Sequence, residues 1–145
     1  MTAPPGHDDT REQVGRVHAG ELDLPIDAAL IAGYLAHLGP GETRLLVEHV
    51  AGSGEALLDR MAAAGAAGGD DRAMRRLAHD IAGTLGTLGF VVHAALAHAI
   101  ETALPDTDRA TREARLASLL AARGRIGRSA LAALDRILPA SEGSP

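Results

Sequence analysis

Residues 74–89 have the sequence MRRLAHDIAGTLGTLG, which predicts a helix with one apolar side and one polar side. At about 100° per residue, a single apolar stripe collects Met74, Leu77, Ile81, Leu85 and Leu88. By the same helical-wheel arithmetic, His79 projects about 155° from the centre of that stripe. We therefore expect the stripe to face a core and His79 to face solvent, near the middle of a long helix.

Two glycines share the polar face with His79: Gly83 one turn later and Gly86 two turns later. Glycine inside a helix costs about 1 kcal/mol relative to alanine, so two of them need a reason. Without side chains there, the imidazole stands clear and another protein can approach it closely. Gly86 and Gly89 could instead allow helices to cross closely, and we expect Gly89 to bend or end the helix.

A spacing pattern around the histidine resembles the signature of histidine-containing phosphotransfer (HPt) domains. The pattern is His-x-x-x-Gly followed by Leu-Gly at the ninth and tenth positions after the histidine, here His79, Gly83, Leu88 and Gly89. Upstream, residues 25–27 open a short apolar helix that precedes residues 39–42 and a long helix, as in the first half of the family. Downstream, Ile100 and Glu101 match the apolar-Glu pair that the family usually has in its next helix. The resemblance covers residues 22–138.

The resemblance implies a phosphorelay function. His79 would accept a phosphoryl group from the aspartate of one receiver domain and pass it to another. A neutral imidazole suits this role, because its ordinary pKa of about 6.5 leaves it nucleophilic near pH 7. Phosphoryl transfer mainly requires positioning and charge neutralisation. The partners would be response-regulator receiver domains, with a hybrid histidine kinase as a further candidate, and the receiver would supply Mg²⁺.

One position departs from the family pattern. The family usually has lysine three residues after the histidine, whereas this chain has Ala82 there and contains no lysine. Arg75 and Arg76 lie one turn before His79 on the wheel, one on either side, and either could supply the missing charge. Ala82 also favours the alternative function, a non-catalytic helical module that binds receiver domains or other partners without phosphotransfer.

The sequence has no G-x-x-x-x-G-K-[ST] phosphate loop and no pattern typical of an ATP-binding domain. We expect a phosphocarrier that has no ATP-dependent kinase activity and no cofactor of its own.

Composition supports an all-α class. Among the 145 residues, 46% are hydrophobic and only 1% are aromatic, namely Tyr34 and Phe90. A core of Ala, Leu, Ile and Val suits close-packed helices. Short loops between amphipathic helices predict an antiparallel up-down four-helix bundle, with a short extra N-terminal helix covering one end. One domain at 22–138 is expected, between flexible tails at 1–21 and 139–145, as a monomer.

Charge and residue types exclude several functions. The net charge of −5 argues against nucleic-acid binding, which needs a basic surface. The chain has no cysteine, so disulfides and thiolate chemistry are impossible. It also lacks an apolar run long enough for a membrane span and a signal-peptide pattern, so we expect a cytoplasmic protein with no membrane contact.

Breaker residues divide the chain into five expected helices: 27–38, 42 to about 64 with a kink at residues 52–54, 70–88, 90–104 and 108–138. In the second helix the residues expected to face the core are Leu46, Val50, Leu57 and Met61. In the fourth they are Val92, Leu96, Ala99, Ile100 and Ala103. In the last they are Leu116, Leu119, Ile126, Ala130, Leu134 and Ile137.

The other histidines carry weaker signals. His37 and His49 are expected to be solvated, and two more, at positions 7 and 18, lie in the N-terminal tail. His93 and His98 are five residues apart and do not share a helix face, so a zinc site would need ligands from other helices. A helical metal-binding protein is therefore a third hypothesis, which we do not adopt. Glu101 is equally compatible with a surface salt bridge.

Overall fold

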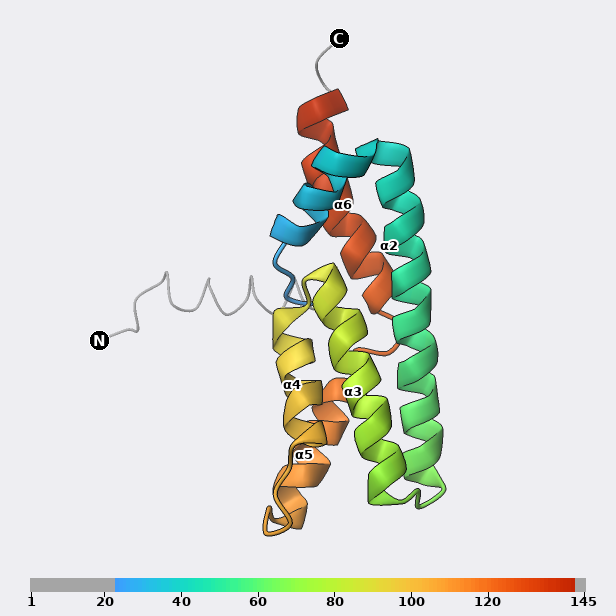
Figure 1. Ribbon diagram of the computed structural model, residues 1–145, viewed down its shortest axis with the longest axis vertical. Helices are drawn as coiled ribbons and strands as arrows, with labels where there is room; N and C mark the ends of the chain where they lie inside the picture. The colour runs from blue at the N-terminus through green and yellow to red at the C-terminus, as the bar shows by residue number, and fades with distance from the viewer. Residues whose placement is uncertain (1–22, 143–145) are drawn as a thin grey trace, which may run out of the picture.

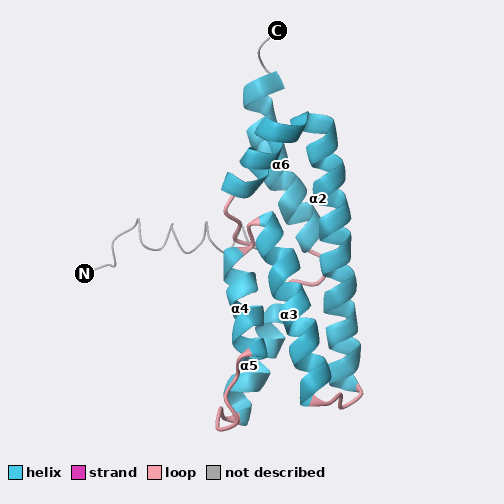
Figure 2. Cartoon of the chain, in the orientation of Figure 1, coloured by secondary structure: helices cyan, strands magenta, loops and turns pink. Residues whose placement is uncertain are grey.

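The computed structural model describes residues 23–142, and within this range it contains five α-helices and no β-strand (Figure 2). The helices are α2 (Ala29–Ala66), α3 (Asp71–Leu88), α4 (Val91–Glu101), α5 (Arg109–Leu120) and α6 (Ile126–Glu142). The predicted all-α class is therefore confirmed for this range. The tail predicted at 1–21 lies outside it, as do residues 143–145. None of the described helices combines the length and apolar character needed to cross a bilayer.

The helices lie roughly along the long axis of the molecule, with α3, α4 and α5 in its lower part and α6 beside the upper part of α2 (Figure 1). In this view the long part of α2 descends, α3 returns upward beside it, and α4 descends beside α3. α5 and α6 then lead back up to the C-terminal end. The short first part of α2 meets the long part at Gly39, whose φ of 81° and ψ of 171° are not helical. This break matches the boundary expected near residues 39–41.

Local sequence explains α3 well. Asp70 is its N-cap, and the Asp70 carboxylate accepts a hydrogen bond from the Ala73 amide at 2.7 Å. Gly89 ends the helix in a left-handed conformation with φ 94°. The predicted stripe faces the core, because its buried members are Leu77, Ile81, Leu85 and Leu88, and Met74 is half-buried.

The kink expected at residues 52–54 is wrong. Gly39 is the residue with non-helical dihedral angles inside α2, and the helix runs regularly through Gly54. Gly54 is buried, and a Cβ there would lie 3.4 Å from Leu85 Cδ2 and 3.8 Å from Ile126 Cγ2. This glycine lets α3 and α6 pack closely against α2, so it serves packing and not bending.

The single last helix expected over 108–138 is also wrong, because the structure divides it into α5 and α6. Gly124 adopts a left-handed conformation with φ 77° in the connection. Glu55 of α2 then accepts hydrogen bonds from the amides of Gly124 at 2.7 Å and Ile126 at 3.0 Å. A carboxylate from another helix thus caps the start of α6. α6 itself continues to Glu142, beyond the expected end at Leu138.

Two further expectations differ at α4 and α2. α4 ends at Glu101, three residues before the predicted end, and Val92 is 54% exposed where it was expected to face the core. α4 packs mainly against α3 and α5, so only a narrow side of α4 is covered.

In α2, Val50 and Leu57 are half-buried at the edge of the core, and the buried residues are their neighbours Ala51 and Leu58.

Gly89 joins α3, α4 and the segment before α2. Its carbonyl oxygen accepts a hydrogen bond from the Asp27 amide at 2.8 Å, and a Cβ at Gly89 would collide with the Asp27 carbonyl oxygen. The same segment is held by a buried hydrogen bond from the Leu24 amide to Ser129 Oγ at 2.9 Å. Tyr34 Oη donates to the Thr87 carbonyl at 2.7 Å nearby.

We predict that Gly89→Ala strongly destabilises the protein. A left-handed conformation costs an alanine about 1–2 kcal/mol, and the collision with Asp27 adds to this cost. The matched control is Gly52→Ala, an exposed helical site with open space around the Cβ among the described residues, where alanine should stabilise by up to about 1 kcal/mol. Chemical denaturation of both variants measures the effect, and equal stabilities would contradict this account of Gly89.

Candidate functional site

His79 lies where the sequence places it. It is near the middle of the 18-residue α3, and its side chain is 69% exposed. The neighbours on the opposite side of the helix, Leu77, Ala78 and Ile81, are buried in the core. Burial of these residues fixes the rotation of α3 about its axis, so the imidazole is held outside the core on a rigid element.

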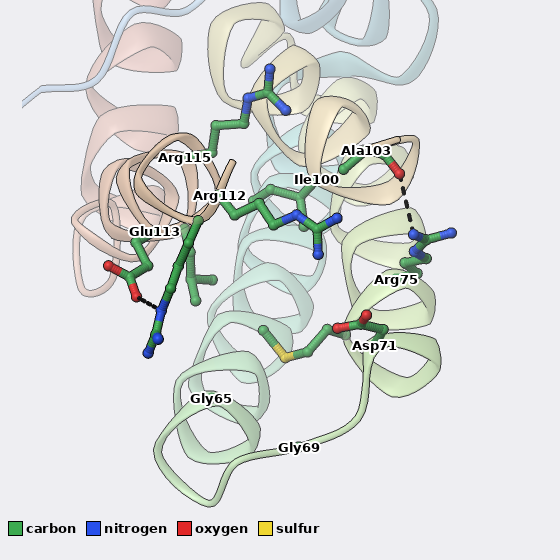
Figure 3. A pocket seen from close by; sticks show the side chains of 12 residues that line it. Gly65, Gly69, Asp71, Arg75, Ile100, Ala103, Arg112, Glu113 and Arg115 are labelled. Carbon is green, nitrogen blue, oxygen red and sulfur yellow. Dashed lines mark hydrogen bonds and ion pairs between the residues drawn. The ribbon is translucent and has the colours of Figure 1, made fainter. Parts of the chain in front are cut away.

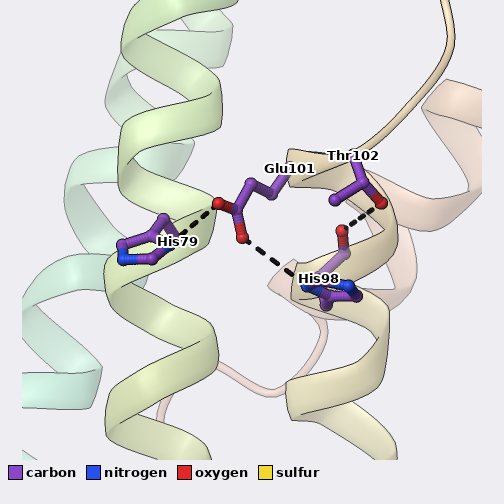
Figure 4. A network of polar contacts seen from close by, with 4 residues as sticks. All are labelled: His79, His98, Glu101 and Thr102. Atoms are coloured by element: carbon purple, nitrogen blue, oxygen red, sulfur yellow. Dashed lines mark hydrogen bonds and ion pairs between the residues drawn. The ribbon is translucent and has the colours of Figure 1, made fainter.

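Glu101, the last residue of α4, reaches His79 across the gap between the two helices (Figure 4). His79 Nδ1 and Glu101 Oε2 are 2.8 Å apart. The Glu101 side chain is only 27% exposed, so it is more buried than the imidazole that it contacts. From the sequence, Glu101 could be either the glutamate of the family's apolar-Glu pair or a partner in a surface salt bridge. Its contact with His79 was not predicted. The available signal was the Ile100–Glu101 pair, which points to the correct residue but not to its partner.

This hydrogen bond determines which ring nitrogen is available for chemistry. A carboxylate only accepts hydrogen bonds, so in the neutral imidazole Nδ1 carries the proton and donates it to Glu101. Nε2 then keeps its lone pair. Figure 4 shows this second nitrogen pointing away from Glu101. His79 therefore presents an oriented nucleophilic nitrogen on the open side of the helix.

Glu101 also contacts a second histidine. His98 lies one turn before Glu101 on α4, and His98 Nδ1 is 3.6 Å from Glu101 Oε1. The His98 carbonyl also accepts a hydrogen bond from Thr102 Oγ1 at 2.9 Å. The carboxylate thus lies between two imidazoles (Figure 4). The sequence assigned no role to His98. Its contact is with the Glu101 oxygen that does not bind His79.

A shallow groove of about 530 Å³ runs beside His79 between α2 and α3. Val50 and Leu57 line its α2 side with apolar surface, which explains why these two residues are only half-buried. The other lining residues are Ser53, His79, Asp80, Gly83, Thr84 and Thr87. The groove gives a partner protein an apolar and hydroxyl-rich surface directly next to the imidazole.

The two glycines of the polar face have different surroundings. A Cβ at Gly83 would meet no heavy atom within 4 Å among the described residues, so this position is open and lines the groove. A Cβ at Gly86 would lie 4.0 Å from Ala94 Cβ, so Gly86 faces α4. Gly83 clears the approach to His79, while Gly86 lies at the closely packed α3–α4 contact.

The two candidate arginines occupy different places. Arg75 donates a hydrogen bond to the Ala103 carbonyl at 3.2 Å, toward the end of α4, and Arg76 is exposed. Neither forms a hydrogen bond with His79 in the described part of the chain. Ala82 is half-buried and packs against the core. Glu101 is the hydrogen-bond partner of His79, and the acidic Asp80 lines the same groove as His79.

The other described histidines differ from His79. His37 and His49 are exposed, and His37 Nδ1 lies 3.0 Å from the Gly33 carbonyl oxygen. His93 is half-buried, and its Nδ1 has no hydrogen-bond partner within the described residues. Burial, and then the charge of Arg125, lower the pKa of His93, so its imidazole is neutral at pH 7. In residues 23–142, no three His, Asp or Glu side chains are grouped closely enough to hold a metal ion.

The model of the Hpt domain family matches residues 46–139, which is more than half of the chain. The chain belongs to the Hpt domain family. No curated protein and no solved structure matches it significantly. The matched range includes most of α2 and all of α3, α4 and α5, and therefore His79, Glu101 and the groove between α2 and α3. Membership confirms the resemblance inferred from the spacing of His79, Gly83, Leu88 and Gly89, and relates the chain to histidine phosphotransfer in phosphorelays.

Proposed function

We propose that this Hpt domain is a phosphocarrier that accepts a phosphoryl group on His79 from a receiver-domain aspartate and passes it to another receiver. The observation that carries the proposal is the 2.8 Å bond between His79 Nδ1 and Glu101, because it leaves Nε2 unprotonated and pointing outward. The open position at Gly83 and the groove beside it supply the approach path.

The proposed transfer balances without an added reagent. His79 Nε2 attacks the phosphorus of an aspartyl phosphate, an N–P bond forms, the P–O bond to the aspartate breaks, and the carboxylate leaves with its electron pair. The ring gains positive charge, which Nδ1–H shares, and Glu101 stabilises that charge. The reverse sequence delivers the group to the next receiver.

The partner contributes what this chain does not carry. A receiver domain supplies the acidic pocket and the Mg²⁺ that offsets phosphate charge. Val50 and Leu57 offer it apolar surface beside His79. We further propose that the helices form the antiparallel up-down bundle expected from their short connections, which keeps α3 rigid while a receiver docks. Such a carrier functions as a monomer in the cytoplasm.

We predict that His79→Gln abolishes phosphorylation by a phosphorylated receiver and leaves helicity and receiver binding intact. Gly83→Leu should also lose most of the transfer, because the leucine side chain fills the approach path while the nucleophile remains. Acid-labile phosphate on the protein after incubation with the phosphorylated receiver measures both effects.

The matched control for Gly83→Leu is Gly52→Leu, which places the same side chain on an exposed helical glycine that does not line the groove. Both leucines should raise helix stability, because leucine has the better helix propensity. Labelling of His79→Gln would show that another residue is the acceptor. Equal transfer by the two leucine variants would remove the argument for access.

We predict that Glu101→Gln slows phosphorylation of His79 by about tenfold, by analogy with the smaller losses that follow removal of the carboxylate partner of a metal-bound histidine. Glutamine keeps the size of the side chain but lacks the charge that stabilises the developing imidazolium. Imidazole ¹⁵N chemical shifts provide a readout that a merely structural role would not move. In the wild type the neutral ring should be protonated at Nδ1, and the variant should show a mixture of tautomers.

Glu48→Gln, on an exposed position of α2, is the control for the loss of one carboxylate. If Glu101→Gln transfers at the wild-type rate with an unchanged tautomer, Glu101 does not position His79.

The second candidate function is a docking module without phosphotransfer, and Ala82 is the observation that favours it. A phosphoryl group arriving at His79 meets Glu101 and Asp80, so a nearby cation is needed to offset repulsion. We propose that Arg75 or Arg76 supplies it.

We predict that Arg75→Gln or Arg76→Gln slows transfer without unfolding the domain, and that Ala82→Lys speeds transfer or prolongs the phosphorylated form. Rates of labelling and decay measure this, with Arg72→Gln, an exposed site in the first turn of α3, as the control. If none of these changes matters, the compensation hypothesis is wrong. A wild-type protein that no receiver of its own cell labels would establish the docking module.

A further inference from the structure

A cavity of about 400 Å³ lies at the end of the helices where α2 turns into α3 and α4 is followed by α5 (Figure 3). Its size falls within the range of about 300–1,000 Å³ that small-molecule sites occupy. It is separate from the groove beside His79, because the two share no lining residue.

The walls of the cavity combine apolar surface with positive charge. Met74, Ile100 and Leu116 supply the apolar part. The charged lining residues are Arg75, Arg109, Arg112, Arg115, Asp71 and Glu113. Arg109 pairs with Glu113, and Arg115 lies close enough to Asp108 to act on its charge, so the positive charge that remains beside Asp71 is that of Arg75 and Arg112, in a chain whose net charge is −5.

Much of this positive charge is not neutralised by ion pairs. Arg75 donates to the Ala103 carbonyl at 3.2 Å, and Arg112 donates to the carbonyls of Leu104 at 2.9 Å and Pro105 at 3.1 Å. These carbonyls orient the guanidinium groups without cancelling their charge. The buried Nε of Arg112 has no hydrogen-bond partner among the described residues. Only Arg109, through its 2.7 Å bond to Glu113, forms an ion pair within this set.

We propose that this cavity binds a small phosphate monoester that has an apolar body. The phosphate would lie against the guanidinium groups of Arg75 and Arg112, whose planar donor arrays match phosphate oxygens. Its charge of about −1.5 to −2 at pH 7 suits two guanidinium groups better than the single charge of a carboxylate does. The apolar body would lie against Met74, Ile100 and Leu116. The proposal does not depend on phosphotransfer by His79.

The test uses the full chain and 1-naphthyl phosphate as the probe, followed by two-dimensional ¹H–¹⁵N NMR. Shifts should saturate at one equivalent and concentrate on residues that line the cavity, not on Gly83 and Thr87 in the groove. Inorganic phosphate, 1-naphthol and 1-naphthoate should each bind at least tenfold more weakly than the ester. Inorganic phosphate lacks the apolar body, 1-naphthol lacks the charge, and 1-naphthoate lacks the second negative charge.

Two variants test the mode of binding. Arg75→Gln should weaken binding of 1-naphthyl phosphate about tenfold, and Arg76→Gln, its neighbour outside the cavity, should not. Gly65→Leu should block the cavity without changing charge, since a Cβ there already lies 3.8 Å from Leu116 Cδ2, whereas Gly52→Leu should have no effect. Arg112 is left unchanged, because it holds the loop after α4.

The proposal is overturned if the probe does not bind, if its shifts map to the groove, or if Arg75→Gln and Gly65→Leu both bind normally. It is also overturned if 1-naphthol, 1-naphthoate or inorganic phosphate binds as tightly as the ester. Because binding is measured without transfer, failure of this proposal leaves the carrier function untouched, and the reverse also holds.

Discussion

The hydrogen bond between His79 and Glu101 depends on how closely α3 and α4 approach each other. Gly86 faces Ala94 at this contact, so small residues on both helices bring the backbones together. Gly89 sets the angle at which the chain leaves α3, and α4 begins two residues later. If either helix rotated about its axis, Glu101 would no longer reach Nδ1. The chemistry of one exposed imidazole therefore depends on packing well away from it.

Charge is distributed unevenly along α3. The charged groups beside His79 are Glu101 and Asp80, whereas arginines from α3 and α5 gather one turn and more toward the start of the helix. In the proposed transfer, an acidic neighbour stabilises the positive charge that develops on the imidazole, but it opposes an incoming phosphate. Arg75 lies at the boundary between these regions, with its guanidinium bound to the Ala103 carbonyl. Arg75 therefore lines the basic cavity and also lies one turn from His79 on α3.

The sequence predicts α3 well because its signals are local. Asp70 caps it, Gly89 ends it, and the apolar stripe recurs with the helical period, so neither its ends nor its rotation depends on distant residues. The division of the last helix depends instead on Glu55 of α2, which binds the connection from 69 and 71 residues away. The contact of Glu101 with His79 depends on the relative rotation of two helices. Periodicity within one helix contains neither kind of information.

Glycine illustrates the same limit, because one residue type serves different purposes. Gly54 makes room for Leu85, Gly86 makes room for α4, and Gly83 has open space around it and lines the groove. Each costs about 1 kcal/mol in a helix, and the sequence assigned Gly54 to a kink and both Gly83 and Gly86 to access, because it does not show which helix faces each position. Full burial of one leucine, worth about 1.5–3 kcal/mol, exceeds that cost, and α3 buries both Leu85 and Leu88 completely. The apolar side of α3 therefore stabilises the helix enough for its opposite side to be shaped for access to His79.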